Sequence, residues 1–233
     1  IFREAVKCKG TISAPANAMS KVSPSIAGKV NSIYFKLGDH VSAGQTIASI
    51  SGNEFMELQQ RFAEAAAAFS KSKVDYERAK SLWAEKIGAE KDFLDAQTTY
   101  RSAYASYQSL RSRITALGLK ASSIENGHMY TSYPVVAPIC GHLTKINAVI
   151  GQYIDVNSDI AEIVNVKGLQ LKLSVYESDV RKIKIGQTII FGSSSSPNNT
   201  LSARLVTCGK TVNPDTKTIN CIAMSDKGSG APM

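Results

Sequence analysis

The sequence of 233 residues has few of the features that identify an enzyme or a membrane-spanning protein. No apolar run approaches 18 residues, so a membrane-spanning helix is not expected. No nucleophile-elbow, phosphate-binding-loop or HExxH motif occurs. Histidine is limited to three scattered positions, and His40 lies in a turn sequence where we expect it to be solvated. We therefore predict a non-enzymatic chain without catalytic residues or cofactors.

Cysteine and methionine are also sparse, which argues against a metal site. The four cysteines have no metal-ligand spacing, and the five methionines are dispersed. Cys140 and His142 point to one face of a predicted strand but provide only two ligands, so no metal site is predicted. Cys208 and Cys221 flank a turn sequence, and both a cross-strand disulfide and two buried thiols remain open.

Acidic residues are fewer than basic ones: the sequence has 19 Asp and Glu and 27 Lys and Arg, which gives a net charge of +8. Basic and acidic residues are interleaved along the expected helices, as in KVDYERAK, and no recognition-helix or RNA-binding pattern is present. We therefore predict no nucleic-acid partner. No signal peptide is recognisable at Ile1, and the last residues have no clear stopping point, which favours a piece of a longer protein.

A repeat interrupted by a long insertion is the most informative positive feature. Residues 28–50 match residues 141–163 at a constant offset of 113, which places Gly28 on Gly141 and Gly38 on Gly151. Each copy alternates β-forming residues with turn residues. A copy of this length buries too little surface to be stable alone. The two copies are therefore predicted to close one small β-sandwich, which the chain leaves half-built and completes after the insertion.

The insertion has the heptad spacing of a coiled-coil seam. Apolar or small residues recur at alternating steps of three and four, first from Phe55 to Trp83 and again from Phe93 to Leu117. Two antiparallel helices that turn near residue 88 then pair positions whose numbers sum to 176: Phe62 with Ile114, Phe69 with Tyr107, Tyr76 with Tyr100, and Trp83 with Phe93.

Local signals set the details of this hairpin. Large and small residues alternate along both arrays, so we also expect Phe or Tyr of one helix to lie over Ala of the other. Ser51 with Glu54 predicts a capping box at the entry. Gly88 predicts the end of the first helix, over residues 53–86.

Downstream of residue 164, the segments LQLKLSVY, GQTIIFG and TLSARLVTC alternate with turns and predict a small β-barrel or sandwich module. The stretch EAVKCKGTIS predicts one more strand, either of this barrel or of a missing domain. The fold class is therefore mixed α and β, elongated and multidomain. It combines a split β-sandwich, an inserted antiparallel coiled-coil α-hairpin and a small β-barrel.

The order of these segments resembles that of a periplasmic adaptor subunit, or membrane fusion protein, of a tripartite RND-type efflux pump. The resemblance leans toward the heavy-metal-efflux-like branch and covers almost the whole chain. It rests on residues 28–50, the heptad hairpin, APICGHLTKINAVIGQYIDVNSDIAEI, LKLSVYESDVRKIKIGQ, and NPDTKTI followed by GSGAPM.

The resemblance implies a domain order. Residues 21–52 with 133–166 would form a split lipoyl-like domain, residues 53–128 the α-helical hairpin, and residues 167–233 the β-barrel domain. Residues 1–20 would supply a strand to the barrel or to a missing membrane-proximal domain.

The resemblance also implies a non-enzymatic adaptor in the periplasm, attached to the inner membrane through an anchor outside this chain. Such an adaptor links an inner-membrane RND-type transporter to an outer-membrane channel protein. It self-associates into a ring, and a hexamer is usual. The exported compounds would be metal ions, drugs or other small toxic compounds, among which the sequence does not distinguish.

One motif of this family can be placed residue by residue at the hairpin tip. It consists of Arg, three residues, Leu, six residues and Ser, and in the family it docks on the outer-membrane channel. Arg78 and Leu82 stand at the required spacing, and Ala89 replaces the Ser. An Ala at this position loses a helix N-cap, at a cost of about 1 kcal/mol. The resemblance thus implies Arg78, Leu82 and Ala89 as partner-binding residues.

Two other interpretations remain open. Adaptors of ABC-type exporters or type I secretion systems are similar in hairpin and barrel. A biotin- or lipoyl-carrier domain would also explain the repeat, but its modified lysine is expected at the joint between the copies. The stretches SGNEF and SYPVVAP at that joint contain no lysine.

Overall fold

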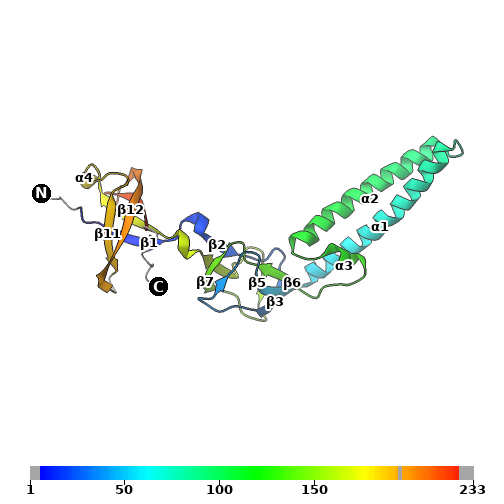
Figure 1. Ribbon diagram of the computed structural model, residues 1–233. Coiled ribbons are helices and arrows are strands. Elements are labelled where there is room, and N and C mark those ends of the chain that lie inside the picture. Colours follow the sequence, from blue (N-terminus) through cyan, green and yellow to red (C-terminus); the bar gives the residue numbers. More distant parts are fainter. Residues whose placement is uncertain (1–5, 194–195, 226–233) are drawn as a thin grey trace.

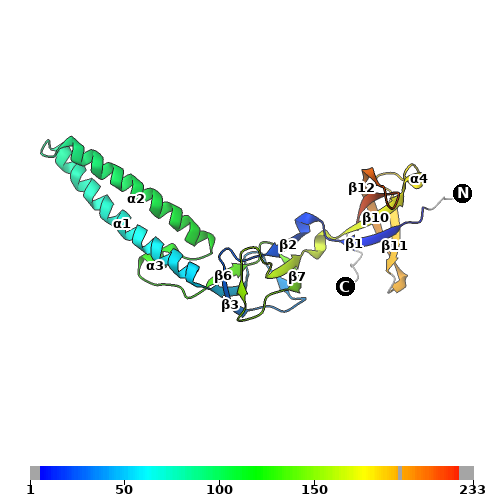
Figure 2. The ribbon, with the colours of Figure 1, turned by 180° about the vertical axis from the view of Figure 1, so that it is seen from behind.

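The computed structural model describes residues 6–193 and 196–225. Its three parts follow one another in a row, so the molecule is elongated (Figure 1). A five-stranded sheet lies at one end, a unit of two small sheets lies in the middle, and a helical hairpin extends from the far side. The view from behind shows the same order (Figure 2). No helix of this described part is long and apolar enough to cross a membrane.

The middle unit consists of two four-stranded sheets, and each sheet takes strands from both copies of the repeat. One sheet has the order β2–β9–β7–β4 and the other β6–β5–β3–β8. Their bounds are β2 (Met19–Val22), β9 (Ala161–Val164), β7 (Gly141–Ile146), β4 (His40–Val41), β6 (Tyr133–Val136), β5 (Thr46–Ser51), β3 (Gly28–Ile33) and β8 (Tyr153–Ile154). The copies therefore do not form one sheet each, because the short strands β4 and β8 cross to the other copy's sheet.

Backbone hydrogen bonds repeat across this exchange. The Gly38 N–H donates to the Leu143 carbonyl at 2.8 Å, and the equivalent Gly151 N–H donates to the Val30 carbonyl at 2.8 Å. Both glycines have positive φ, 89° and 87°, which other residues rarely adopt. The offset of the repeat is thus visible as an approximate twofold symmetry of the backbone.

The core of this unit continues into the base of the hairpin. Val30, Ile50, Leu143 and Ile163 are buried in one cluster with a set of residues from the helices: Phe55, Leu58, Phe62, Ile114, Leu117 and Ile124. Burying large apolar side chains is worth about 1.5–3 kcal/mol each. The base of the hairpin is therefore anchored, although its far end extends into solvent.

The hairpin consists of α1 (Asn53–Ala84) and α2 (Glu90–Ala116), followed by the short α3 (Ala121–Glu125). Helix α1 has 32 residues and is roughly 48 Å long. The residues at the predicted seam positions are buried or half-buried, apart from the more exposed Trp83 at the tip. The heptad pattern therefore identified the contacting faces of the two helices.

The seam contains a continuous series of aromatic rings. The predicted pairs Phe69–Tyr107, Tyr76–Tyr100 and Trp83–Phe93 are in contact, with ring centroids 4.8, 5.1 and 5.0 Å apart. Further ring contacts link these pairs into one series: Phe62–Tyr107, Phe69–Tyr100 and Tyr76–Phe93. The rings thus stack on one another, where we had expected Phe or Tyr to lie over Ala. The smaller residues between them let the rings reach across the seam.

Helix α1 begins at Asn53, as predicted, but its capping and its last residue differ from the prediction. Gly52 is the N-cap of α1, with no side-chain capping bond, and the Ser51 hydroxyl instead donates to Asn31 Oδ1 at 2.8 Å. The capping box of Ser51 with Glu54 is therefore not formed. Helix α1 also ends at Ala84, two residues before the predicted end.

The five-stranded sheet is antiparallel throughout, in the order β1–β10–β13–β12–β11. Its elements, together with the short helix α4 (Glu177–Val180), are β1 (Lys9–Ser13), β10 (Gln170–Tyr176), β13 (Thr218–Ser225), β12 (Ser196–Asn213) and β11 (Thr188–Ser193). Strands β1 and β11 are its edges, so the sheet is a half-barrel where we had predicted a small barrel. The strand predicted near the start of the chain is β1, and it pairs with β10.

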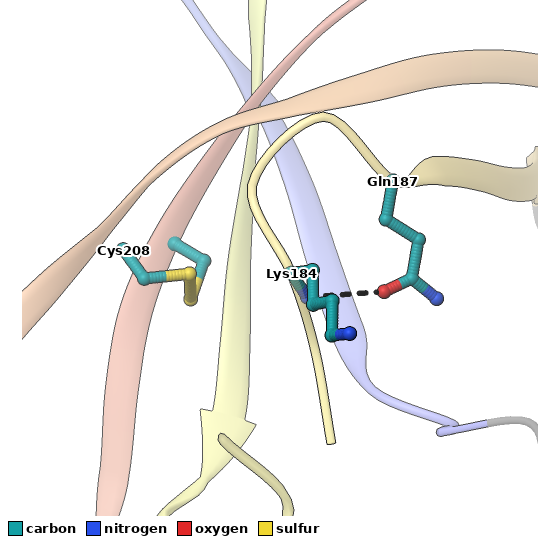
Figure 3. The surroundings of a disulfide bond; sticks show 4 residues. Lys184, Gln187 and Cys208 are labelled. Carbon is teal, nitrogen blue, oxygen red and sulfur yellow. Dashed lines mark hydrogen bonds between the residues drawn. A yellow bond between two sulfur atoms is a disulfide. The ribbon is translucent and has the colours of Figure 1, made fainter. Parts of the chain in front are cut away.

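Cys208 and Cys221 lie directly opposite each other on β12 and β13 and form a disulfide. The sequence had left open whether these cysteines pair. Figure 3 shows this bond beside the turn in which the Lys184 N–H donates to Gln187 Oε1 at 3.2 Å. The other two cysteines, Cys8 and Cys140, are free and exposed.

The chain passes between neighbouring parts twice. The helical turns η1 (Ala16–Ala18) and η2 (Val166–Gly168) both link the half-barrel to the middle unit, and they lie side by side. There the Asn165 N–H donates to the Ala18 carbonyl at 2.7 Å. On the other side, residues 51–53 enter the hairpin and residues 126–132 return from it.

Candidate functional site: the hairpin tip

The tip is the end of the hairpin farthest from the half-barrel (Figures 1 and 2). Helix α1 closes there with two characteristic backbone bonds. The Lys86 N–H donates to the Trp83 carbonyl at 3.0 Å, and the Ile87 N–H donates to the Leu82 carbonyl at 2.9 Å. This pattern is a Schellman motif, which requires a left-handed residue. Lys86 takes that conformation, with φ 61°.

Gly88, where we had predicted the helix to end, has a different role. Its N–H donates to the Leu82 carbonyl at 3.0 Å. A Cβ at this position would lie 3.2 Å from Leu82 Cβ, so the loop folds back closely over Leu82. The glycine therefore serves close packing, while the left-handed turn falls on Lys86.

Ala89 is the N-cap of α2, with φ −73° and ψ 139° and no side-chain capping bond. The Asp92 N–H already donates to the Ala89 carbonyl at 3.1 Å, so the backbone has the geometry of a capped helix. Glu90 and Asp92 place negative charge in the first turn, where the helix dipole favours it. The tip therefore lacks only the side-chain oxygen that a Ser at position 89 would supply.

Arg78 and Leu82 lie one turn apart on the same face of α1. The Arg78 side chain is 69% exposed, and its guanidinium is 4.0 Å from the Asp75 carboxylate, a separation at which an exposed pair contributes little. Leu82 is 41% exposed. Because Gly88 binds the Leu82 carbonyl, Ala89 begins α2 close to Leu82, and the structure brings this pair together with Arg78 one turn below.

The tip is more apolar than the motif alone indicates. Ile87 is 73% exposed, and Trp83 and Leu94 are also exposed. We call Leu82, Trp83, Ile87 and Leu94 the tip cluster. Ile87 falls outside the heptad arrays and outside the motif, so neither pattern predicts it as a contact residue. The signal available was an isoleucine between two helices, in a loop too short to bury it.

Such a site has no catalytic chemistry, and what it offers is a contact surface. The tip cluster supplies apolar area, and Arg78 supplies a planar donor suited to carbonyl or carboxylate oxygens. Within the described ranges, no group of three or more His, Cys, Asp or Glu side chains is arranged to hold a metal ion.

The sequence of this chain is similar to a known protein family and to individual members of known function. Residues 18–165 match the model of the CzcB-like, barrel-sandwich hybrid domain. The chain is 27% identical over 191 residues to the cobalt-zinc-cadmium resistance protein CzcB of Cupriavidus metallidurans. This alignment covers 82% of this chain and 36% of that protein. It is 26% identical over 178 residues to the nickel-cobalt-cadmium resistance protein NccB of Alcaligenes xylosoxydans xylosoxydans, covering 76% and 43%. The chain thus spans less than half the length of these two relatives.

Solved structures share the fold. ZneB from Cupriavidus metallidurans aligns with TM-score 0.58 at 21% identity, over 94% of this chain and 90% of that one. A MacA–MexA chimera that contains the Pseudomonas aeruginosa MexA α-hairpin domain aligns with TM-score 0.72 at 18% identity, over 99% and 79%. Because the family model matches more than half of the sequence, the chain belongs to the CzcB-like family, the heavy-metal-efflux branch of the membrane fusion proteins.

Proposed function

We propose that this chain is the non-enzymatic, periplasmic part of an adaptor that links an inner-membrane RND-type transporter to an outer-membrane channel. The observation that carries the proposal is a hairpin of roughly 48 Å whose base is anchored in a core and whose tip cluster is exposed. Exposed apolar side chains gathered at the end of a long extension indicate a contact with another protein. Membership of the family supports an outer-membrane channel as that partner.

At the tip, Arg78 donates hydrogen bonds to carbonyl or carboxylate oxygens of the channel, while Leu82 and Ile87 enter apolar notches. The loop that folds over Leu82 binds its backbone carbonyl, so little backbone entropy is lost on docking. Ala89 is the third contact, and as a small side chain it lets the channel approach the start of α2. These roles follow the family motif at Arg78 and Leu82.

The hairpin acts as a spacer of fixed length. We interpret its seam of stacked rings as that of a two-stranded antiparallel coiled coil, and stacked rings are worth about 0.5–1.5 kcal/mol per pair beyond their buried area. The split lipoyl-like unit of residues 21–52 with 133–166 packs against its neighbours in a ring, for which a hexamer is usual in the family. The half-barrel faces the transporter and the inner membrane, to which the full-length protein is attached.

The relatives support a proposal for the substrate class. Their names record resistance to cobalt, zinc, cadmium and nickel. We propose that the pump served by this adaptor exports divalent metal ions.

The tip contact is tested in the full-length protein with Leu82→Asp. A charge at this exposed apolar site opposes docking without disturbing the seam. Val74→Asp is the matched control, because Val74 is 56% exposed on the same helix and roughly 12 Å nearer the base. We expect Leu82→Asp to abolish both co-purification of the channel from crosslinked membranes and metal resistance, and Val74→Asp to retain both. Retention of both by Leu82→Asp would refute the tip contact.

The same purification identifies the motor. Recovery of an RND-type transporter by mass spectrometry supports the proposal. Recovery of an ABC-type protein keeps the adaptor role and replaces the transporter.

A further inference from the structure

Two histidines that are far apart in the sequence lie side by side on neighbouring strands of one sheet of the middle unit. His40 on β4 and His142 on β7 are direct partners in an antiparallel pairing. Side chains of directly opposed residues point to the same face of a sheet. The neighbouring Leu143 N–H donates to the Asp39 carbonyl at 3.0 Å, so the His pair occupies the next, non-hydrogen-bonded position, where side chains approach most closely.

The two rings are separated by a distance that suits a shared ion. Their centroids are 5.1 Å apart and their planes are inclined at 76°. Two imidazoles that both bind a tetrahedral ion through nitrogens about 2.0–2.1 Å away have centroids roughly 5.2 Å apart. His40 is exposed and His142 half-buried, so an ion can reach the pair from solvent.

His142 is oriented as a ligand. Its Nδ1 lies 3.1 Å from the Gly38 carbonyl oxygen. A carbonyl only accepts hydrogen bonds, so Nδ1 carries the proton and the neutral ring keeps its lone pair on Nε2. Metal-binding histidines are typically fixed by such a bond from the second nitrogen. The left-handed conformation of Gly38, with φ 89°, sets the direction of this carbonyl.

The repeat provides an internal comparison. The offset of 113 relates His142 to Lys29 and His40 to Tyr153, and Lys29 and Tyr153 are direct partners on β3 and β8. The same backbone arrangement therefore occurs twice, and only one of the two positions carries a pair of imidazoles. The backbone geometry alone does not explain the pair.

We propose that His40 and His142 form a two-imidazole site for a borderline divalent transition-metal ion, such as Zn²⁺, Ni²⁺ or Cu²⁺. Imidazole favours these ions over Mg²⁺ and Ca²⁺, which take oxygen ligands. The remaining coordination positions are open to water or to an exchangeable ligand. The site lies outside the hairpin tip, so the proposal of metal binding does not depend on the proposed docking to a channel.

The test is isothermal titration calorimetry of the untagged protein with NiCl₂ and ZnCl₂, with MgCl₂ as the control salt. We expect binding of Ni²⁺ and Zn²⁺ and none of Mg²⁺. His40→Gln and His142→Gln should each weaken affinity by at least about tenfold, the smallest loss usual for a disturbed metal site. His128→Gln is the matched control, because His128 is exposed and outside the pair, and it should bind as the wild type does. Cys140→Ser should also bind normally.

A second measurement uses the unmodified protein. On addition of Zn²⁺, the ring C–H resonances of His40 and His142 should shift in NMR spectra, and those of His128 should not. The proposal is overturned if the wild type binds neither metal, if both pair variants keep wild-type affinity, or if Cys140→Ser abolishes binding.

Discussion

Replacing Ala89 by Ser should strengthen the start of α2 and slow the opening of the hairpin tip. The backbone at position 89 already has N-cap geometry, with ψ 139° and the Asp92 N–H on its carbonyl. The Ser hydroxyl would accept the N–H of Lys91 or Asp92, which has no side-chain partner in the wild type. Creating such a cap stabilises a helix end by about 1 kcal/mol, within a range of about 0.5–2 kcal/mol.

Because the tip lies far from either core, this energy acts on local opening rather than on global unfolding. A change of about 1 kcal/mol corresponds to about a fivefold change in the opening equilibrium. Amides in the first turn of α2 should therefore exchange with deuterium about fivefold more slowly, as measured by hydrogen exchange with mass spectrometry. Ala105→Ser, at an exposed interior position of α2, is the control and should produce no slowing. Equal exchange in Ala89→Ser and the wild type would refute the capping argument.

Further expectations concern the cores, the disulfide and one ion pair. Phe62→Ala, at a fully buried ring in the hairpin base, should lower the free energy of unfolding by about 3–5 kcal/mol in urea titrations. Gly141→Ala should lower it by about 1–3 kcal/mol in thermal melts, because a Cβ would lie 2.5 Å from a carbonyl oxygen of β9; an unchanged melting temperature would contradict this close packing. Reducing the cross-strand disulfide, which joins cysteines 13 residues apart, should destabilise the half-barrel by about 3 kcal/mol in guanidinium titrations with and without reductant. The hydrogen bond from Lys21 holds the pKa of Asp159 below its ordinary value, so its stabilising effect is present at neutral pH and is lost as pH falls through the lowered pKa. Lys21→Met should raise the pKa of Asp159 in NMR titrations, and an unmoved titration would argue against the bond.

The sequence predicted what depends on periodicity. Heptad spacing selected the contacting helix faces, and the sum of 176 placed Phe69 opposite Tyr107 and Trp83 opposite Phe93, where the rings stack. Aromatic rings are long enough to meet across the seam, which the expected packing of large over small residues did not consider.

What the sequence could not predict depends on long-range pairing or on small local energies. The exchange of β4 and β8 between sheets involves two-residue strands, which are too short to carry a pattern. The meeting of His40 with His142 follows from that exchange, and for the same reason His40 lies in a strand, although its sequence resembles a turn. At the tip, Lys86 takes a left-handed conformation that costs about 1–2 kcal/mol. The left-handed residue of the loop is therefore Lys86 and not the nearby Gly88, although glycine would adopt this conformation without that cost.

The twofold passage of the chain between its parts has a mechanical consequence. The half-barrel and the middle unit are joined by η1 and η2 lying side by side, and the hairpin is joined to the middle unit by an outgoing and a returning segment. Each pair of neighbouring parts is therefore connected by two chain segments that run side by side, and not by a single linker. Rotation of the hairpin about its long axis would wind its two connecting segments around each other. Bending would instead stretch one segment and compress the other. At each joint, a sideways load at the tip is thus shared between two segments of the chain.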